Sequence, residues 1–318
     1  MKKILNILFC LVLLSAALQI SVCAEDPETN PAGTFDPGTE TVLLNSGYEI
    51  PLRGVCCTGA SAEETENLVY LALKSGFRFI DVSDSYKNEE AAGRGIQKAI
   101  DEKIVSRDEI FVAAGAHTEK YETGEAVVEG SLTRLGLDHL DLMFLQQNDF
   151  AKDRDAWLAM NEAAAAGTVR SLGLSGFYEV MNYELITGIG TVQPAVIRVG
   201  ISPYQQDPQI KAYAAGSGTV VMTQAPFGDK VESRVLFADP VISRLATWYR
   251  KTSDQIVLRW QLQNGTAAVP CVKNEAQLNE YADILDFSLS DEEMQQINAL
   301  NRRDQLYEFI SEAVNPEY

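Results

Sequence analysis

The feature that most constrains the fold is a unit of one short apolar strand and one helix, repeated along most of the chain. The predicted strands are short runs rich in apolar residues, and the segments between them carry apolar residues at helical spacing. The expected strands are 54–58, 77–82, 110–114, 140–145, 169–174, 196–201, 219–223 and 267–269. The expected helices are 62–75, 89–101, 124–135, 153–166, 178–187, 209–216, 240–251, 254–264 and 274–285.

Strands that are apolar on both faces and joined by helices form a parallel sheet with helices outside it. Eight such units within about 250 residues predict a closed (β/α)8 barrel, the TIM barrel. A doubly wound open sheet is the alternative, but no Gly-x-Gly-x-x-Gly turn follows the first strand. We therefore expect a barrel domain over 41–318, with residues 41–51 forming a short hairpin that covers one end.

Residues 1–24 are predicted to be a signal peptide. They begin with two lysines, continue with an apolar run over 4–18, and end in the small residues expected before cleavage after Ala24. The apolar run is short for a membrane span. Acylation of Cys23, as in a lipoprotein, is a weaker alternative, because Val22 is larger than the residue that usually precedes such a cysteine. The prediction is an exported protein, secreted or periplasmic, without a membrane span after cleavage.

The segment 25–40 is rich in proline, glycine, threonine and acidic residues, which is typical of a disordered linker. The whole chain carries a formal net charge of −19. Such an excess of negative charge repels a polyanion, so nucleic acid is not an expected partner.

Three cysteines follow the signal peptide, at Cys56, Cys57 and Cys271. This number does not make a disulfide framework. Either Cys56 or Cys57 could pair with Cys271 if the fold joins them, and one thiol would then stay free. With only two histidines and no metal-ligand spacing, the chain is not expected to bind zinc.

One predicted strand, 77–82, delivers a carboxylate near its carboxyl end, at Asp81, and Tyr86 follows in a polar loop. A phenol close to a carboxylate can be an acid with a tuned pKa, which is a catalytic arrangement. The alternative is structural, with Asp81 capping the next helix and Tyr86 packing.

Several stretches together resemble the aldo-keto reductase family, from about residue 41 to 301. They are 76–81 with 86–89 for the family's aspartate and tyrosine, 131–142 for the helix and strand before its histidine, 167–177 for its Gly-Val-Ser-Asn-Phe strand, and 286–294 for its final helix. The resemblance implies a TIM barrel that reduces carbonyl compounds with NADP(H).

The family's chemistry uses four side chains. A tyrosine protonates the carbonyl oxygen as hydride arrives, a lysine paired with an aspartate lowers the pKa of that tyrosine, and a histidine orients the substrate. Asp81 and Tyr86 match, whereas Gly115 stands at the lysine position and Gln146 at the histidine position. Glutamine can still donate a hydrogen bond to a carbonyl, but glycine removes the cation, so Tyr86 should behave as an ordinary phenol.

The positions that the resemblance assigns to NADP(H) also depart from the family. A serine–asparagine pair becomes Ser175 and Gly176, and an asparagine–glutamine pair becomes Ile197 and Arg198. In addition, Gln224 replaces the tyrosine that stacks on the nicotinamide, and Cys271 and Val272 replace the lysine–serine pair that holds the 2′-phosphate. Gln277 and Tyr281 replace an arginine and an asparagine near that phosphate, whereas Glu280 remains. Lys273 lies close in the sequence and could partly substitute for the lost contacts to the phosphate.

The leading hypothesis is an exported, catalytically degenerate aldo-keto-reductase barrel that keeps a small-ligand site at its C-terminal end. The second hypothesis is a reductase with a rearranged site, acting on a carbonyl substrate through Tyr86 and Asp81. In that site His117 could supply the missing cation, and Arg198 could point into the cleft. Otherwise, His117 is a solvated loop residue and Arg198 pairs with a barrel acid. A third class, an interaction protein using the acidic exterior, is permitted by the sequence but not indicated.

Overall fold

The structure is a computed structural model that describes residues 35–36, 40–57, 59–83, 88–116, 118, 124–223 and 225–302 of the 318-residue chain. The chain divides into the units Met1–Pro31 and Ala32–Tyr318, and all described residues belong to the second. The predicted signal peptide therefore lies outside the described residues. Within the described ranges, no helix combines the length and the apolar character needed to cross a membrane.

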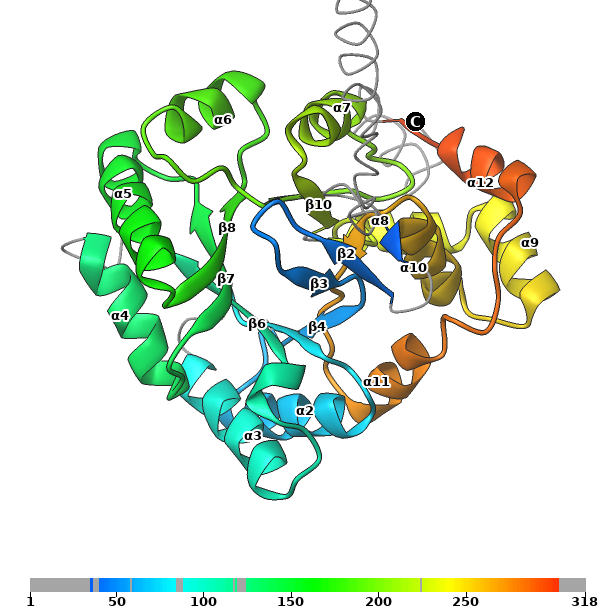
Figure 1. The fold of residues 1–318 in the computed structure, drawn as a ribbon. Helices are drawn as coiled ribbons and strands as arrows, with labels where there is room; N and C mark the ends of the chain where they lie inside the picture. Colours follow the sequence, from blue (N-terminus) through cyan, green and yellow to red (C-terminus); the bar gives the residue numbers. More distant parts are fainter. Residues whose placement is uncertain are drawn as a thin grey trace, which may run out of the picture. The chain divides into compact units, whose positions relative to one another are not determined.

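Eight parallel strands form the centre of this unit, which confirms the predicted TIM barrel (Figure 1). Neighbouring strands are consecutive in the chain, as the repeated strand–helix unit requires. The last strand meets the first through bridges from Arg53 to Ala268 and from Cys56 to Cys271, which bring the barrel close to closure. The strands are β4 (Gly54–Cys56), β5 (Phe79–Asp81), β6 (Phe111–Ala116), β7 (Leu140–Gln146), β8 (Val169–Ser175), β9 (Val196–Val199), β10 (Val220–Thr223) and β11 (Ala267–Ala268).

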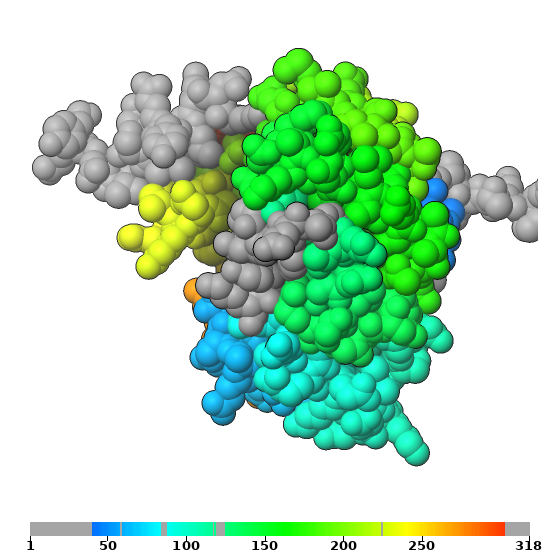
Figure 2. Space-filling model, turned by 90° about the vertical axis from the view of Figure 1, so that its left-hand side faces the viewer, coloured from blue at the N-terminus to red at the C-terminus, as the bar shows by residue number. Residues whose placement is uncertain are grey.

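Helices surround the strands in Figure 1, and those from α3 to α5 lie along the side that faces the viewer in Figure 2. They are α2 (Ala62–Lys74), α3 (Glu89–Asp101), α4 (Gly124–Leu135), α5 (Phe150–Ala166), α6 (Val180–Thr187), α7 (Pro208–Ser217), α8 (Lys230–Phe237), α9 (Pro240–Tyr249), α10 (Ser253–Gln263), α11 (Glu275–Ala282) and α12 (Asp291–Asn298), with a 3-10 turn η2 (Arg107–Glu109).

The boundaries of the predicted helices agree with the structure to within three residues. Helix α5 begins three residues before the prediction, because the Asp149 carboxylate accepts hydrogen bonds from the backbone N–H groups of Ala151 and Lys152. Helix α8 was absent from the prediction. It is only eight residues long, and begins where Asp229 caps the backbone N–H groups of Val231 and Glu232.

A small antiparallel sheet covers the N-terminal end of the barrel, as predicted for residues 41–51. It consists of β1 (Phe35–Asp36), β2 (Thr41–Leu43) and β3 (Glu49–Pro51). Strand β1 lies within the segment 25–40 that the sequence assigns to a linker. The turn between β2 and β3 is joined to the barrel by a 2.8 Å contact between the Ser46 and Ser171 hydroxyl oxygens. This hairpin lies in front of the barrel strands in Figure 1.

Aromatic rings that come from the strands pack within the barrel. The rings of Phe79 and Phe111 meet edge to face, with their centroids 5.0 Å apart. Glycines make room for two of the rings: a Cβ at Gly54 would lie 2.8 Å from the Phe79 ring, and one at Gly173 would lie 2.6 Å from the Phe144 ring. Full burial of each such ring stabilises the fold by about 1.5–3 kcal/mol. Arg198 packs against this core, with its guanidinium carbon 4.8 Å from the Phe144 centroid.

Candidate functional site

The candidate site lies at the carboxyl ends of the strands, where barrel enzymes carry their active residues. Asp81, Gln146 and Ser175 are the last residues of β5, β7 and β8. The parallel register pairs Gln146 with Ser175, and Ser175 with Arg198 of β9. Four residues singled out from the sequence are therefore brought to one end of the barrel by the strand register alone.

Arg198 joins these strand ends. The residue is 1% exposed, and Nη1 donates to Oδ2 of Asp81 at 3.3 Å. Nε donates to Oγ of Ser175 at 3.0 Å, and Nη2 approaches Oε1 of Gln146 at 3.5 Å. Nη1 also donates to the hydroxyl of Ser83. Of the two alternatives for Arg198, pairing with a barrel acid is thus confirmed.

Asp81 is held for this ion pair by its own loop. Its Oδ1 accepts a hydrogen bond from the backbone N–H of Ser83 at 2.8 Å, and the residue is only 4% exposed. Helix α3 has Asn88 at its N-cap, so the prediction of Asp81 as a helix cap is wrong. An isolated buried carboxylate is costly, and the guanidinium of Arg198 compensates its charge.

Gly115 of β6 occupies the position at which the family resemblance expects a lysine. A Cβ built on Gly115 would lie 2.2 Å from the carbonyl oxygen of Ser83. This distance is far below any van der Waals contact, so the strand has no room for a side chain there. Among the described residues, the cation paired with Asp81 comes instead from β9, through Arg198.

The carboxamide of Gln146 has a fixed orientation. Its Oε1 accepts a hydrogen bond from the Ser175 hydroxyl at 2.8 Å, so Nε2 points the other way. A Cβ at Gly176 would lie 2.9 Å from that Nε2, and Gly176 has a positive φ of 78°. No described residue makes a hydrogen bond to Nε2 that the structure records. Since Gln146 is half-exposed, this amide can donate to a ligand at the mouth of the barrel.

A disulfide lies beside the Asp81–Arg198 pair and settles which cysteine pairs with Cys271. Cys56 is the partner, across a sequence separation of 215 residues, and Cys57 remains a buried free thiol. Cys56 is also the register partner of Asp81 between β4 and β5. Burial and the nearby Asp81 charge raise the pKa of the Cys57 thiol to about 12. Cys57 is therefore protonated at neutral pH and a poor nucleophile.

The remaining residues predicted for cofactor binding lie further along the rim. Lys273 is exposed, and its backbone N–H donates to Oε1 of Gln277 at 2.8 Å. Glu280 is half-buried on α11. Burial raises the pKa of Asp254, and the negative charge of Glu280 raises it further. No hydrogen bond or ion pair between described residues joins Lys273 or Glu280 to Arg198. The structure therefore does not bring these two residues together with the network around Asp81.

Three predicted site residues, Tyr86, His117 and Gln224, lie outside the described residues. Ser83 was missed by the sequence analysis, although it accepts a hydrogen bond from Arg198 and packs against Gly115. Its position two residues after Asp81 is the signal that could have indicated it, because short polar residues in such turns bond to the aspartate side chain. Among the described residues, no group of three His, Cys, Asp or Glu side chains is placed to hold a metal ion.

Comparison with known proteins agrees with the family resemblance that the sequence motifs indicated. A model described as the aldo/keto reductase family matches residues 52–302. The glyoxal reductase of Bacillus subtilis is 34% identical over 271 residues, which is 84% of this chain and 95% of that protein. The morphine 6-dehydrogenase of Pseudomonas putida is 32% identical and is aligned over 82% of this chain and 90% of its own length.

Solved structures show the same similarity. The crystal structure of an aldo-keto reductase from Bombyx mori in complex with NADP superposes with a TM-score of 0.74 and 27% sequence identity. It covers 84% of this chain and 94% of its own. An aldo/keto reductase from Brucella melitensis also gives a TM-score of 0.74 and 27% identity, over 82% of this chain and 99% of that chain.

Proposed function

The chain belongs to the aldo/keto reductase family. We propose that, within this family, it is a barrel whose NADP(H)-dependent carbonyl reduction is lost or strongly impaired. The C-terminal end of the barrel is retained as a binding site for a small carbonyl-bearing ligand. The observation that carries the proposal is that Gly115 leaves no room for the family's lysine, because a Cβ there would lie 2.2 Å from the carbonyl oxygen of Ser83. Asp81 is instead ion-paired with Arg198.

In this ion pair Arg198 supplies a positive charge to Asp81, but not from the position at which the family has its lysine. Gly115 has no space for a side chain, so the cation reaches Asp81 from β9, four places from β5 in the strand order, and not from the neighbouring β6. The guanidinium is also engaged by Ser83 and Ser175. A guanidinium stays charged at all ordinary pH values and cannot act as the proton donor. Loss of one preorganised charge-stabilising group costs about 10²–10³ in rate.

The residues at the nicotinamide end do not fit the cofactor contacts expected from the family. Ser175 is fully buried, and its single hydroxyl proton is donated to Gln146, so it is not available to a ligand. Arg198 is buried and bonded within the barrel. The side chains that should hold the nicotinamide amide therefore hydrogen-bond to other residues of the site instead.

The phosphate end does not fit either. Cys271 stands where the family has a lysine for the 2′-phosphate, and its sulfur is bonded to Cys56. Val272, at the serine position, is fully buried. Lys273, the next residue in the chain, is exposed and could act only as a single, solvated point charge. NADP(H) is nevertheless the cofactor to test, because family membership assigns it to this end of the barrel.

What the site retains is a donor for a carbonyl oxygen. The amide Nε2 of Gln146 is fixed by the bonds that Ser175 and Arg198 make to its Oε1. A preorganised N–H group of this kind binds a carbonyl without the ordering cost of a free side chain. We therefore propose that a carbonyl-bearing ligand binds at Gln146 without being reduced.

We also propose that the chain is exported. The leader-like segment 1–24 supports this, and the disulfide between Cys56 and Cys271 gives a second, independent reason. Disulfides persist in oxidising compartments and are rare where thiols are kept reduced. Amino-terminal sequencing of the chain from its source should begin at Glu25, and Met1 on the isolated protein would refute this part of the proposal.

The main experiment is a titration of the purified chain with NADPH and NADH, followed by tryptophan fluorescence, together with turnover assays. Glyoxal and D-xylose serve as carbonyl probes, with the Bacillus subtilis relative as the active control. We expect no saturable binding in the micromolar range and a rate at least about 10²-fold below the control. Micromolar binding with comparable turnover would overturn the proposal.

A working reductase with a rearranged site is the second candidate, and the Arg198–Asp81 distance of 3.3 Å is the observation that favours it. In that case Arg198 replaces the family's lysine as the cation, and Tyr86 remains the acid. Arg198→Lys should then keep measurable turnover, whereas Arg198→Met should lose it, at temperatures where both are folded. In the degenerate barrel, neither variant changes a rate that is already at background.

A further inference from the structure

A well-defined hollow lies among described residues at the opposite, N-terminal end of the barrel, and the proposed function does not use it. This basal pocket has a volume of about 480 Å³, and among the residues lining it are Tyr48, Glu49, Arg53, Arg78, Asp108 and Arg170. The hairpin of β2 and β3 forms one wall, and the residues that open the barrel strands form the other. Small-molecule sites commonly occupy about 300–1,000 Å³, so the pocket has the size of a ligand site.

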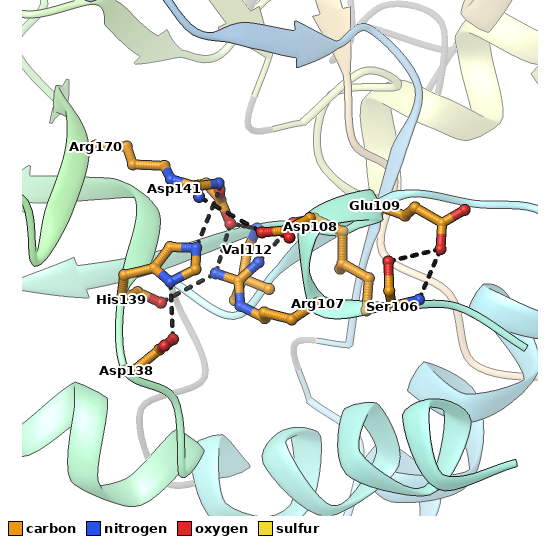
Figure 3. A network of polar contacts seen from close by, with 10 residues as sticks. Ser106, Arg107, Asp108, Glu109, Val112, Asp138, His139, Asp141 and Arg170 are labelled. Atoms are coloured by element: carbon orange, nitrogen blue, oxygen red, sulfur yellow. Dashed lines mark hydrogen bonds and ion pairs between the residues drawn. The ribbon is translucent and has the colours of Figure 1, made fainter. Parts of the chain in front are cut away.

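The charges on the barrel side of the pocket are compensated by one another. The buried Asp141 accepts hydrogen bonds from Arg107 and Arg170, each at 2.8 Å, and from the backbone N–H of Val112 at 2.9 Å. Figure 3 shows this carboxylate between the two guanidinium groups. Arg170 also lies 3.8 Å from Asp108. These groups have strong hydrogen-bonding capacity but little net charge to offer a ligand.

The other charged groups of the pocket have local partners too. Arg53 lies 3.9 Å from Glu40, and Nη1 of Arg78 donates to the backbone carbonyls of Leu73 and Phe77. Glu49 accepts a hydrogen bond from the Thr41 hydroxyl at 2.9 Å. A ligand anion would meet the pocket carboxylates and a ligand ammonium would meet the arginines, so a single net charge is not favoured.

The pocket therefore presents hydrogen-bond donors and acceptors side by side. Guanidinium groups only donate and carboxylates only accept, whereas a hydroxyl group does both. A ligand with several adjacent hydroxyl groups can bond to both kinds of side chain at once. Tyr48 adds an aromatic surface: it is 44% exposed, and the guanidinium carbon of Arg170 lies 5.3 Å from its ring centroid. Such a ring offers apolar area to the C–H face of a sugar.

We propose that the basal pocket binds a neutral carbohydrate of one or two sugar units. Tyr48 packs against the sugar ring, and Arg78, Arg170 and Glu49 hydrogen-bond to its hydroxyl groups. This site is separate from the C-terminal end of the barrel, so it does not depend on whether NADP(H) binds there.

The test is ligand-observed NMR and calorimetry on the purified chain with five probes: D-glucose, D-galactose, N-acetyl-D-glucosamine, maltose and cellobiose. At least one probe should bind saturably. Tyr48→Ala should weaken that binding by about tenfold or more, as expected for loss of an aromatic contact worth about 1.4 kcal/mol. Arg78→Gln should weaken it as well, and circular dichroism should show that both variants keep the fold.

Tyr178→Ala is the matched control, because Tyr178 is 43% exposed, nearly the same as Tyr48, and follows β8 at the C-terminal end. Its binding should equal that of the unmodified chain. Three results would each overturn the inference: no binding by any of the five sugars, equal binding by Tyr48→Ala, or loss of binding in Tyr178→Ala. Tighter binding of gluconate or glucosamine than of glucose would also overturn it, since the pocket would then select a charged ligand.

Discussion

Replacing Cys271 by serine should destabilise the barrel more than other conservative single substitutions. The disulfide joins Cys56 of the first strand to Cys271, just after the last strand, across 215 residues of sequence. In the chain-entropy description, a cross-link stabilises by restricting the unfolded chain, with an entropy of about −2.1 − 1.5R ln n cal/mol/K for a loop of n residues. A loop of this length corresponds to about 5 kcal/mol at 25 °C.

Thermal and denaturant unfolding of Cys271→Ser, each with and without dithiothreitol, measures this contribution. At about 2 °C per kcal/mol, which is the lower end for larger domains, the melting temperature should fall by about 10 °C. Dithiothreitol should lower the melting temperature of the unmodified chain to that of the variant, and it should not change the melting temperature of the variant. The serine at position 271 adds little cost of its own, because this residue is only half-buried.

Cys57→Ala is the control, since Cys57 is buried next to Cys56 but carries no cross-link. It removes one buried sulfur atom and should cost only about 1 kcal/mol. The reasoning is refuted if Cys271→Ser melts within about 2 °C of the unmodified chain, or if reductant has no effect on the latter. Packing and hydrogen bonds across the strand junction would then hold the barrel without the cross-link.

Three further substitutions, and a control at Gly216, test the site and the buried acids by equilibrium unfolding. Arg198→Met leaves Asp81 buried without its cation and should cost about 3–5 kcal/mol; a loss below 1 kcal/mol would mean that other groups compensate the carboxylate. Gly115→Ala places a methyl group against a backbone carbonyl and should cost about 1–3 kcal/mol, whereas Gly216→Ala, in a helix with open space around it, should be neutral or stabilising. Burial raises the pKa of Glu232 above its usual 4.5, because the folded state favours the protonated carboxyl group. The free energy of unfolding is therefore not reduced by this group at acidic pH, and it falls as the pH rises through the raised pKa. Glu232→Gln should therefore gain stability over the unmodified chain as pH increases, and a gain that is equal at pH 4 and pH 8 would contradict this assignment.

The fold follows from local patterns that depend on few residues at a time. Buried parallel strands must be apolar on both faces, and the helices between them must carry one apolar stripe, so the repeat is visible without any knowledge of tertiary contacts. The helices α3 and α4 have the predicted bounds, whereas α8 and α12 were not predicted from the periodicity, because both are only eight residues long. The register of the strand ends also follows from this pattern, and it places Asp81, Gln146 and Ser175 together.

The contacts within the site depend on distances between residues far apart in the chain. Arg198 reaches Asp81 across 117 positions, and no local pattern distinguishes a side chain that points into the cleft from one that pairs with a buried acid. The same holds for the choice between Cys56 and Cys57, which are neighbours in sequence.

The sequence by itself therefore predicted the barrel and the family, and its resemblance to that family placed Gly115 and Gln146 at the lysine and histidine positions. Only the tertiary structure decided that Gly115 is pressed against the carbonyl of Ser83, that Arg198 takes over the charge of Asp81, and that arginines and acids from separate strands line a pocket at the other end. The physical reason is that periodicity reports which face of an element is buried, whereas ion pairs, close approaches and pockets depend on how those faces meet.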